Sequence, residues 1–337
     1  MRSLAIVAIG YLVIVPLAAW VMVWQQSPEQ SILNVSYDPT RELWRDLNKS
    51  FQEEYLKESG KRIAFRQSHG GSGSQARAVI DGLDADVVTL AMWSDTEAIS
   101  KKGLIAKGWE DRLPNHSLPY YSTIVLVVRQ GNSKKIRDWD DLIEPGVSVI
   151  TPNPKISANG RMSFLAAWGA VLKNGGSEAD AERYVTELYR HHSPVLDSGA
   201  RGSAMTFAQK KIGDVHIAWE NEAHQEVRES NGQLEIVYPK HSMKAEPYVA
   251  WVDANIDRKG TRAVAEAYLK FLYTDEAQRI IAEHYYRPFN EEVLRAHPEL
   301  KEINLFTIKD VAKDWDDAQK RFFGDGGVFD RIFQQKN

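Results

Sequence analysis

The sequence predicts an α/β protein made of two units with a ligand cleft between them. From residue 30 onward, short runs rich in β-branched residues alternate with longer helical stretches, which is the rhythm of βαβ units with mostly parallel sheets. This rhythm occurs in two successive series along the chain. The chain has 337 residues, and at about 150 residues per domain that length also suggests two domains. A cleft between two such units is the expected place for a ligand.

The first unit begins with an apolar strand and a capped helix. Asp38 or Thr40 can cap this helix, Pro39 suits its first turn, and Glu42 adds an early acid. The predicted strands are 32–36, 63–67 and 87–90, and the predicted helices are 42–57 and 75–82.

The second unit repeats the alternation, and no low-complexity linker separates it from the first. Its predicted strands are 124–129, 147–151, 215–219 and 236–238, and its predicted helices are 161–173, 178–190, 203–210 and 220–229. An extended stretch at 248–252 then precedes helices predicted at 261–273, 275–284 and 311–323.

The N-terminal residues 1–26 form an export segment. The uncharged run at 4–24 would span about 30 Å as a helix, longer than the apolar part of an ordinary signal peptide. We therefore expect either a cleaved signal peptide or an uncleaved anchor in the inner membrane. Arg2 before the run favours leaving that end inside, so the rest of the chain would lie outside the cytoplasm.

Composition excludes several classes of function. The absence of cysteine rules out disulfide scaffolds, thiolate metal sites and cysteine nucleophiles. A formal net charge of −4 gives no overall attraction to nucleic acid, so we expect no nucleic-acid partner. The histidines are scattered and show no metal-ligand spacing, and no G-x-S-x-G elbow occurs. We expect no catalytic set, no metal and no cofactor.

Four loops place small or hydroxyl residues between a strand and a helix, the position at which helix N-termini bind anions. These loops are 36–42, 68–75, 151–161 and 196–203. The loop at 68–75 carries three glycines, which we expect to turn backbone N–H groups towards a ligand. Downstream, Trp219 ends a predicted strand, where its indole can donate a hydrogen bond into the cleft.

Two nucleotide-binding interpretations compete for the glycine loop. The loop lacks the Gly-Lys-Ser/Thr ending of a nucleotide phosphate loop. Gly71, Gly73 and Ala76 match G-x-G-x-x-A, and Asp95 follows at a suitable distance for a dinucleotide site. That motif is short and frequent, and an exported protein rarely meets nicotinamide cofactors, so simple anion binding is favoured.

Six motifs in order resemble those of the sulfate-binding proteins, the solute receptors of sulfate and thiosulfate ABC importers. They are NVSYDPTRE at 34–42, SHGGSG at 68–73, VITPNPK at 149–155, LDSGARGS at 196–203, AWENEA at 218–223 and YYRP at 285–288. The resemblance covers 32–333 and implies a two-lobed periplasmic-binding-protein fold of type II. It implies a first lobe from 32–120 plus 247–337 and a second from 121–246, with hinge crossovers near Ser122 and Pro247.

The resemblance also implies a set of ligand contacts. Backbone N–H groups of Asp38 and Ser72 would come from the first lobe, and the hydroxyl of Ser157 from the second. Ala158, Asn159 and Ala200 would give further backbone donors, and Trp219 would give its indole N–H. The turn at Ala158-Asn159 departs from the two glycines of many relatives, so Asn159 must adopt the required backbone, and asparagine tolerates left-handed conformations well. Ser74 stands where a lysine is common.

An all-donor pocket suits sulfate, which is fully ionised at neutral pH and only accepts hydrogen bonds. Phosphate keeps a proton at that pH and needs an acceptor, so this preference requires the Asp38 carboxylate to point away from the ligand. The implied protein is a monomer that captures sulfate or thiosulfate and delivers it to the permease subunits of an ABC importer. Two alternatives stay open: an exported hydrolase of phosphate or sulfate esters, and a binding protein for another tetrahedral oxyanion such as phosphate or molybdate.

Overall fold

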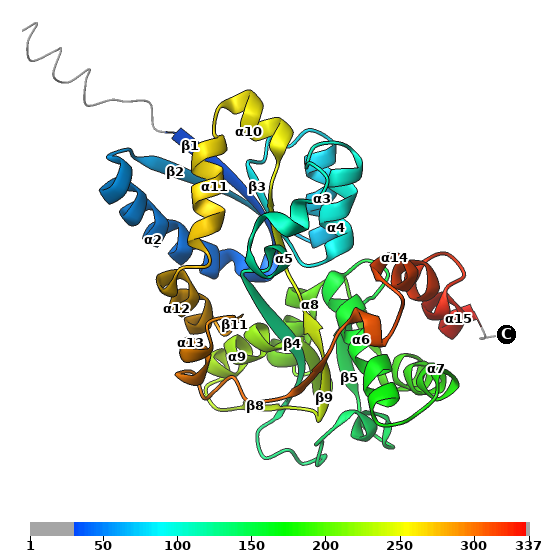
Figure 1. Ribbon diagram of the computed structural model, residues 1–337. Helices are drawn as coiled ribbons and strands as arrows, with labels where there is room; N and C mark the ends of the chain where they lie inside the picture. Colours follow the sequence, from blue (N-terminus) through cyan, green and yellow to red (C-terminus); the bar gives the residue numbers. More distant parts are fainter. Residues whose placement is uncertain (1–29, 335–337) are drawn as a thin grey trace, which may run out of the picture.

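The computed structural model describes residues 30–334, which fold into two α/β lobes with one sheet each (Figure 1). The first lobe is built on a sheet with the strand order β10-β3-β1-β2. Its strands are β1 (Gln30–Tyr37), β2 (Ile63–Gly70), β3 (Val87–Leu90) and β10 (Tyr248–Trp251). Because β1, β2 and β3 run parallel, their carboxyl ends lie at one edge of the sheet.

Helices cover both faces of the first sheet. On one face, Trp44, Phe51 and Tyr268 form an apolar cluster with strand residues, and on the other face Val79 and Ile99 do so. The helices are α2 (Arg41–Ser59), α3 (Ser72–Ile80), α4 (Trp93–Lys101), α5 (Pro114–Ser117), α10 (Asp253–Lys259), α11 (Arg262–Phe271) and α12 (Asp275–Glu283). Every helix predicted for this part of the chain is present, although α3 begins three residues earlier than expected and α4, α5 and α10 were not predicted.

The second lobe is built on a larger mixed sheet, in which β5, β6 and β7 run parallel and β4 runs antiparallel to β7. Its strands are β4 (Tyr120–Arg129), β5 (Val149–Pro152), β6 (Val195–Asp197), β7 (Val215–Trp219), β8 (Leu234–Val237), β9 (His241–Ala245) and β12 (Asn304–Phe306). Its main helices are α6 (Ala158–Lys173), α7 (Glu178–Glu187), α8 (Ala200–Ala204) and α9 (Glu220–Glu229). β6 is too short to show a periodic pattern, which explains why the sequence did not predict it.

The chain passes between the lobes at two adjacent strands. β4 leaves the first lobe, and the chain returns between β9 in the second sheet and β10 in the first. Ser122 pairs with Ala245, so the two passages lie side by side. The crossovers near Ser122 and Pro247 remain a prediction about how the lobes move.

The C-terminal segment differs from the sequence-based expectation. The sequence placed all of 247–337 in the first lobe, whereas β12 pairs with β9 of the second lobe (Figure 1). Phe322 and Phe323 then pack on Phe164 of α6, with ring centroids 5.7 and 5.4 Å apart. The chain therefore passes between the lobes a third time, after β11 (Arg287–Pro288) and α13 (Glu291–Arg295). Long-range aromatic packing, which no local pattern encodes, decides this placement.

The helix predicted at 311–323 was wrong as one continuous element. The chain forms a short turn at Ile308–Asp310, then α14 (Trp315–Ala318), a π-helical turn at Gln319–Phe323 and α15 (Val328–Gln334). Asp314 starts α14 by accepting a hydrogen bond from the backbone N–H of Asp317 at 2.8 Å. A capping side chain inside the apolar pattern thus begins a new helix instead of continuing one.

The export segment predicted at 1–26, including the run at 4–24, lies outside the described residues. Among the helices within 30–334, none is long and apolar enough to cross a membrane.

Candidate functional site

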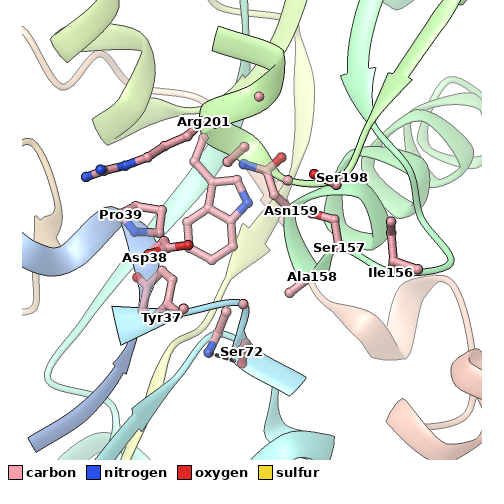
Figure 2. Close-up of a pocket in the computed structure, with 17 residues that line it drawn as sticks. Tyr37, Asp38, Pro39, Ser72, Ile156, Ser157, Ala158, Asn159, Ser198 and Arg201 are labelled. Atoms are coloured by element: carbon pink, nitrogen blue, oxygen red, sulfur yellow. Dashed lines mark hydrogen bonds between the residues drawn. The ribbon is translucent and has the colours of Figure 1, made fainter. Parts of the chain in front are cut away.

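A pocket of about 240 Å³ lies between the lobes, at the carboxyl ends of their parallel strands (Figure 2). From the first lobe it is lined by residues that follow β1, β2 and β3, and from the second lobe by residues that follow β5 and β6 and end β7. Figure 2 shows Tyr37, Asp38 and Ser72 on one side, facing Ser157 and Asn159 on the other. The strand-end loops predicted from the sequence are therefore brought together by the fold.

All seven predicted contact residues line this pocket. They are Asp38, Ser72, Ser157, Ala158, Asn159, Ala200 and Trp219. Ser72, Ala158 and Ala200 are the first residues of α3, α6 and α8, and Asp38 opens the short 3₁₀ turn before α2. The first N–H groups of a helix have no partner inside the helix, so these backbone donors are available to an anion.

The Asp38 carboxylate is engaged by an arginine. Arg41 Nη2 donates to Asp38 Oδ1 at 2.9 Å and to the His69 carbonyl at 3.4 Å. Asp38 is the one acidic residue among those that line the pocket. Because Oδ1 already accepts from Arg41, less of that carboxylate is available to accept a hydrogen bond from a ligand.

The Ser72 hydroxyl also has partners inside the first lobe. It donates to Asp95 Oδ2 at 2.5 Å and accepts from the backbone N–H of Ala91 at 3.0 Å. Burial raises the pKa of Asp95, while the hydrogen bond from Ser72 acts in the opposite direction. The Ser72 side chain therefore ties the start of α3 to the end of β3.

Ser157 is the N-cap of α6 and keeps a donor for the pocket. Its Oγ accepts from the Gly160 N–H at 3.2 Å, which leaves the hydroxyl hydrogen to donate elsewhere. A Cβ atom on Gly160 would lie 2.6 Å from the Pro152 carbonyl oxygen, so only glycine lets α6 approach the end of β5 this closely.

Trp219 contributes a buried indole N–H to the pocket. Its side chain is buried, with 1% of its surface exposed, and its Nε1 has no hydrogen-bond partner among the described residues. Its ring packs against Tyr37 of the first lobe, with centroids 5.6 Å apart. An unpaired buried N–H costs about 1–3 kcal/mol, so this donor is well placed to be satisfied by a bound acceptor.

The Asn159 side chain is hydrogen-bonded to an acidic residue of α9. Its Nδ2 donates to Glu222 Oε2 at 2.7 Å. Burial raises the pKa of Glu222 to about 8, and the charge of the nearby Glu226 adds to this shift. Glu222 is therefore mostly protonated at neutral pH, so it places little negative charge behind the pocket.

The backbone at the glycine loop and at the start of α6 is regular. Gly70, Gly71 and Gly73 do not have positive φ, and β2 continues to Gly70, so only Gly71 separates strand from helix. Asn159 lies in the first turn of α6 and also lacks a positive φ, so the left-handed conformation considered for it is not required.

The sequence did not identify every residue of the pocket. Tyr37, Ile156, Ser198 and Arg201 also line it, each within two residues of a predicted contact. Figure 2 shows Arg201 extending from α8 towards Pro39. The adjacent sequence positions were the only available signal, because the orientation of a side chain depends on the packing of the two lobes.

Comparison with known proteins assigns the family. A sequence model described as bacterial extracellular solute-binding protein matches residues 32–287. The chain belongs to this family. The solute-binding protein is 53% identical over 307 residues to the sulfate-binding protein of Escherichia coli K12, covering 89% of this chain and 92% of that protein. It is 48% identical over 307 residues to the thiosulfate-binding protein of Pseudomonas aeruginosa, covering 90% and 92%.

A solved structure agrees with this assignment. The solute-binding protein is similar to the sulfate-binding protein SubI from Mycobacterium tuberculosis H37Rv, with a TM-score of 0.77 and 29% identity, over 88% of this chain and 100% of that chain. The resemblance to sulfate-binding proteins and the two-lobed α/β fold predicted from the sequence are therefore confirmed.

Proposed function

We propose that this protein binds sulfate or thiosulfate in the pocket between its lobes and delivers the anion unchanged to the permease subunits of an ABC importer. It acts outside the cytoplasm, in the periplasm, as a monomer and without a cofactor. The names of its relatives and its membership of a solute-binding family support this function.

The observation that carries the proposal is the unpaired indole N–H of Trp219. It lies in a pocket where three helices, α3, α6 and α8, also begin, so a dianion there would meet oriented dipoles from both lobes. The contact roles of Asp38, Ser72, Ser157, Ala158, Asn159, Ala200 and Trp219 are part of this proposal.

The acceptors around the pocket favour sulfate over phosphate. Asp38 is paired with Arg41, and Asp95 accepts from Ser72. Glu222 accepts from Asn159. Hydrogen phosphate would therefore present its proton to donors, at a cost of about 1–3 kcal/mol for each unmade hydrogen bond.

The two lobes would close on the anion about the paired strands at Ser122 and Ala245. We propose a first lobe of 32–120 plus 247–303, and a second lobe of 121–246 that also takes the C-terminal segment. The contacts of the C-terminal segment favour moving 304–334 to the second lobe.

The hydrolase alternative has little support. Ser72 donates to Asp95, and neither ring nitrogen of His69 is bonded to that serine. Within 30–334, no group of three or more His, Asp or Glu side chains is arranged to hold a metal ion. We therefore propose that the protein is not an enzyme.

Titration calorimetry with sulfate, thiosulfate, molybdate and phosphate tests the proposal. Sulfate or thiosulfate should bind at micromolar concentration with one site, and phosphate should bind about 10- to 100-fold more weakly. An aryl sulfate and an aryl phosphate, incubated with the protein, should stay intact. Absence of heat with both sulfur oxyanions would refute the function, and turnover of either ester would favour the hydrolase.

A further inference from the structure

We propose that Asn221 is a positioning residue that couples the two lobes to each other at the pocket. It does so through a buried chain of hydrogen bonds made by Ser122, Asn221, Tyr286 and Pro39, which we call the Asn221 network. The inference deepens the proposed function and rests on an anion being bound between the lobes.

The network runs in one direction from the crossover strand to the first lobe. The Ser122 hydroxyl donates to Asn221 Oδ1 at 3.2 Å. Asn221 Nδ2 donates to the Tyr286 hydroxyl at 3.0 Å, and that hydroxyl donates to the Pro39 carbonyl at 3.3 Å. Asn221 and Tyr286 each accept one of these hydrogen bonds and donate the next. Loss of one member therefore leaves a neighbouring polar group without its partner.

The network lies next to predicted contact residues in both lobes. Asn221 lies in the first turn of α9, two residues after Trp219 in the second lobe. Pro39 follows Asp38 directly, in the turn that joins β1 to α2 of the first lobe. Ser122 pairs with Ala245 where the chain crosses between the lobes. One amide side chain therefore connects the crossover with a donor-bearing segment of each lobe.

Burial makes the network important for the geometry of the pocket. Ser122, Asn221 and Tyr286 are 0%, 6% and 1% exposed, so an unmade hydrogen bond in the network is costly. The Tyr286 ring also packs against Tyr120 of β4, with centroids 4.7 Å apart. None of these three side chains lines the pocket, so their effect on the anion must be indirect. A network that orders the donors before binding lowers the conformational cost of binding.

Two variants cut different links of the network without a large change in volume. Tyr286→Phe removes the hydroxyl and keeps the ring, and Ser122→Ala removes the donor to Asn221. Tyr268→Phe is a matched control because, among residues 30–334, its buried hydroxyl bonds only Asn34 and Asn48, both within the first lobe. Sulfate and thiosulfate affinities of the full chain are measured by calorimetry, and folding stability by thermal unfolding.

We expect Tyr286→Phe to weaken both anions about three- to tenfold and by the same factor, the size of one net hydrogen bond. Tyr268→Phe should lower the unfolding temperature and leave both affinities unchanged. The double variant Ser122→Ala/Tyr286→Phe should lose less affinity than the sum of the single losses, whereas Ser122→Ala/Tyr268→Phe should be additive. Wild-type affinity in Tyr286→Phe, or full additivity in the first pair, would overturn the inference.

A ligand-free measurement separates this inference from the proposed function. The chain has no cysteine, so cysteines introduced at the exposed Lys57 and Lys210 give one spin-label pair across the lobes. Electron–electron distance measurements should show a broader distribution in Tyr286→Phe than in Tyr268→Phe without any anion. If the wild type binds neither sulfate nor thiosulfate but this broadening occurs, the proposed function fails and the coupling stands. If the distributions are equal, the coupling fails.

Discussion

Trp219→Phe tests the central feature of the pocket, a buried indole N–H without a partner. The substitution deletes that donor and retains an aromatic ring against Tyr37. A hydrogen bond to a charged group contributes about 1.5–3 kcal/mol, so sulfate affinity should fall about 10- to 150-fold. Because the donor has no partner among the described residues, no other hydrogen bond of the fold is lost.

Trp168→Phe is the matched control. Trp168 is equally buried in the second lobe, but its Nε1 already donates to Glu178 Oε2 at 3.0 Å. This variant should lower the unfolding temperature and leave the affinity unchanged. Calorimetric titration with sulfate, run beside thermal unfolding for both variants, gives the comparison. Equal affinities of Trp219→Phe and the wild type would show that Trp219 only fills the core, and would refute the argument from its unpaired N–H.

Three further predictions concern residues around the pocket. Gly160→Ala should destabilise the protein by about 1–3 kcal/mol and weaken anion binding, because the new Cβ would lie 2.6 Å from the Pro152 carbonyl oxygen. The control Gly73→Ala should be tolerated, because its Cβ would lie 3.6 Å from Asp95 Oδ1. Equal unfolding temperatures of the two variants would contradict this prediction. Sulfate affinity of the wild type should fall as pH rises from about 7 to about 9, because the pKa of Glu222 is raised to about 8 and its ionised form repels a dianion. Because the pKa of Glu222 is raised in the folded protein, the contribution of this residue to stability falls as pH rises from its ordinary pKa towards about 8. Both dependences should be reduced in Glu222→Gln, and a persistent fall in affinity would assign the effect to another group. Arg287→Met should cost about 3–5 kcal/mol in unfolding free energy, because it leaves the buried Glu220 carboxylate without its two hydrogen bonds of 2.6 and 2.7 Å. The double variant Arg287→Met/Glu220→Leu should recover part of this loss. If it recovers nothing, the argument from a buried ion pair is wrong.

The strand-end loops were predictable because their signals are local. Caps, glycines and apolar runs recur within a few residues, and these patterns identified the loop that contains Asp38 and the strand that ends at Trp219. Together with the cleft expected between two α/β units, they indicated where a ligand would bind. The resemblance then selected the contact residues, all of which line one pocket.

The sequence by itself determined most of the strands and helices around the pocket, the two-lobed architecture and the residue types at the strand ends. Only the tertiary structure decided which polar groups find partners. The pairing of Asn159 with Glu222 joins residues 63 apart, and the bond from Tyr286 to Pro39 joins residues 247 apart. The C-terminal segment likewise packs on the second lobe through Phe322 and Phe164. Periodicity extends over only a few helical turns, so contacts of such separation depend on the packing of the whole chain.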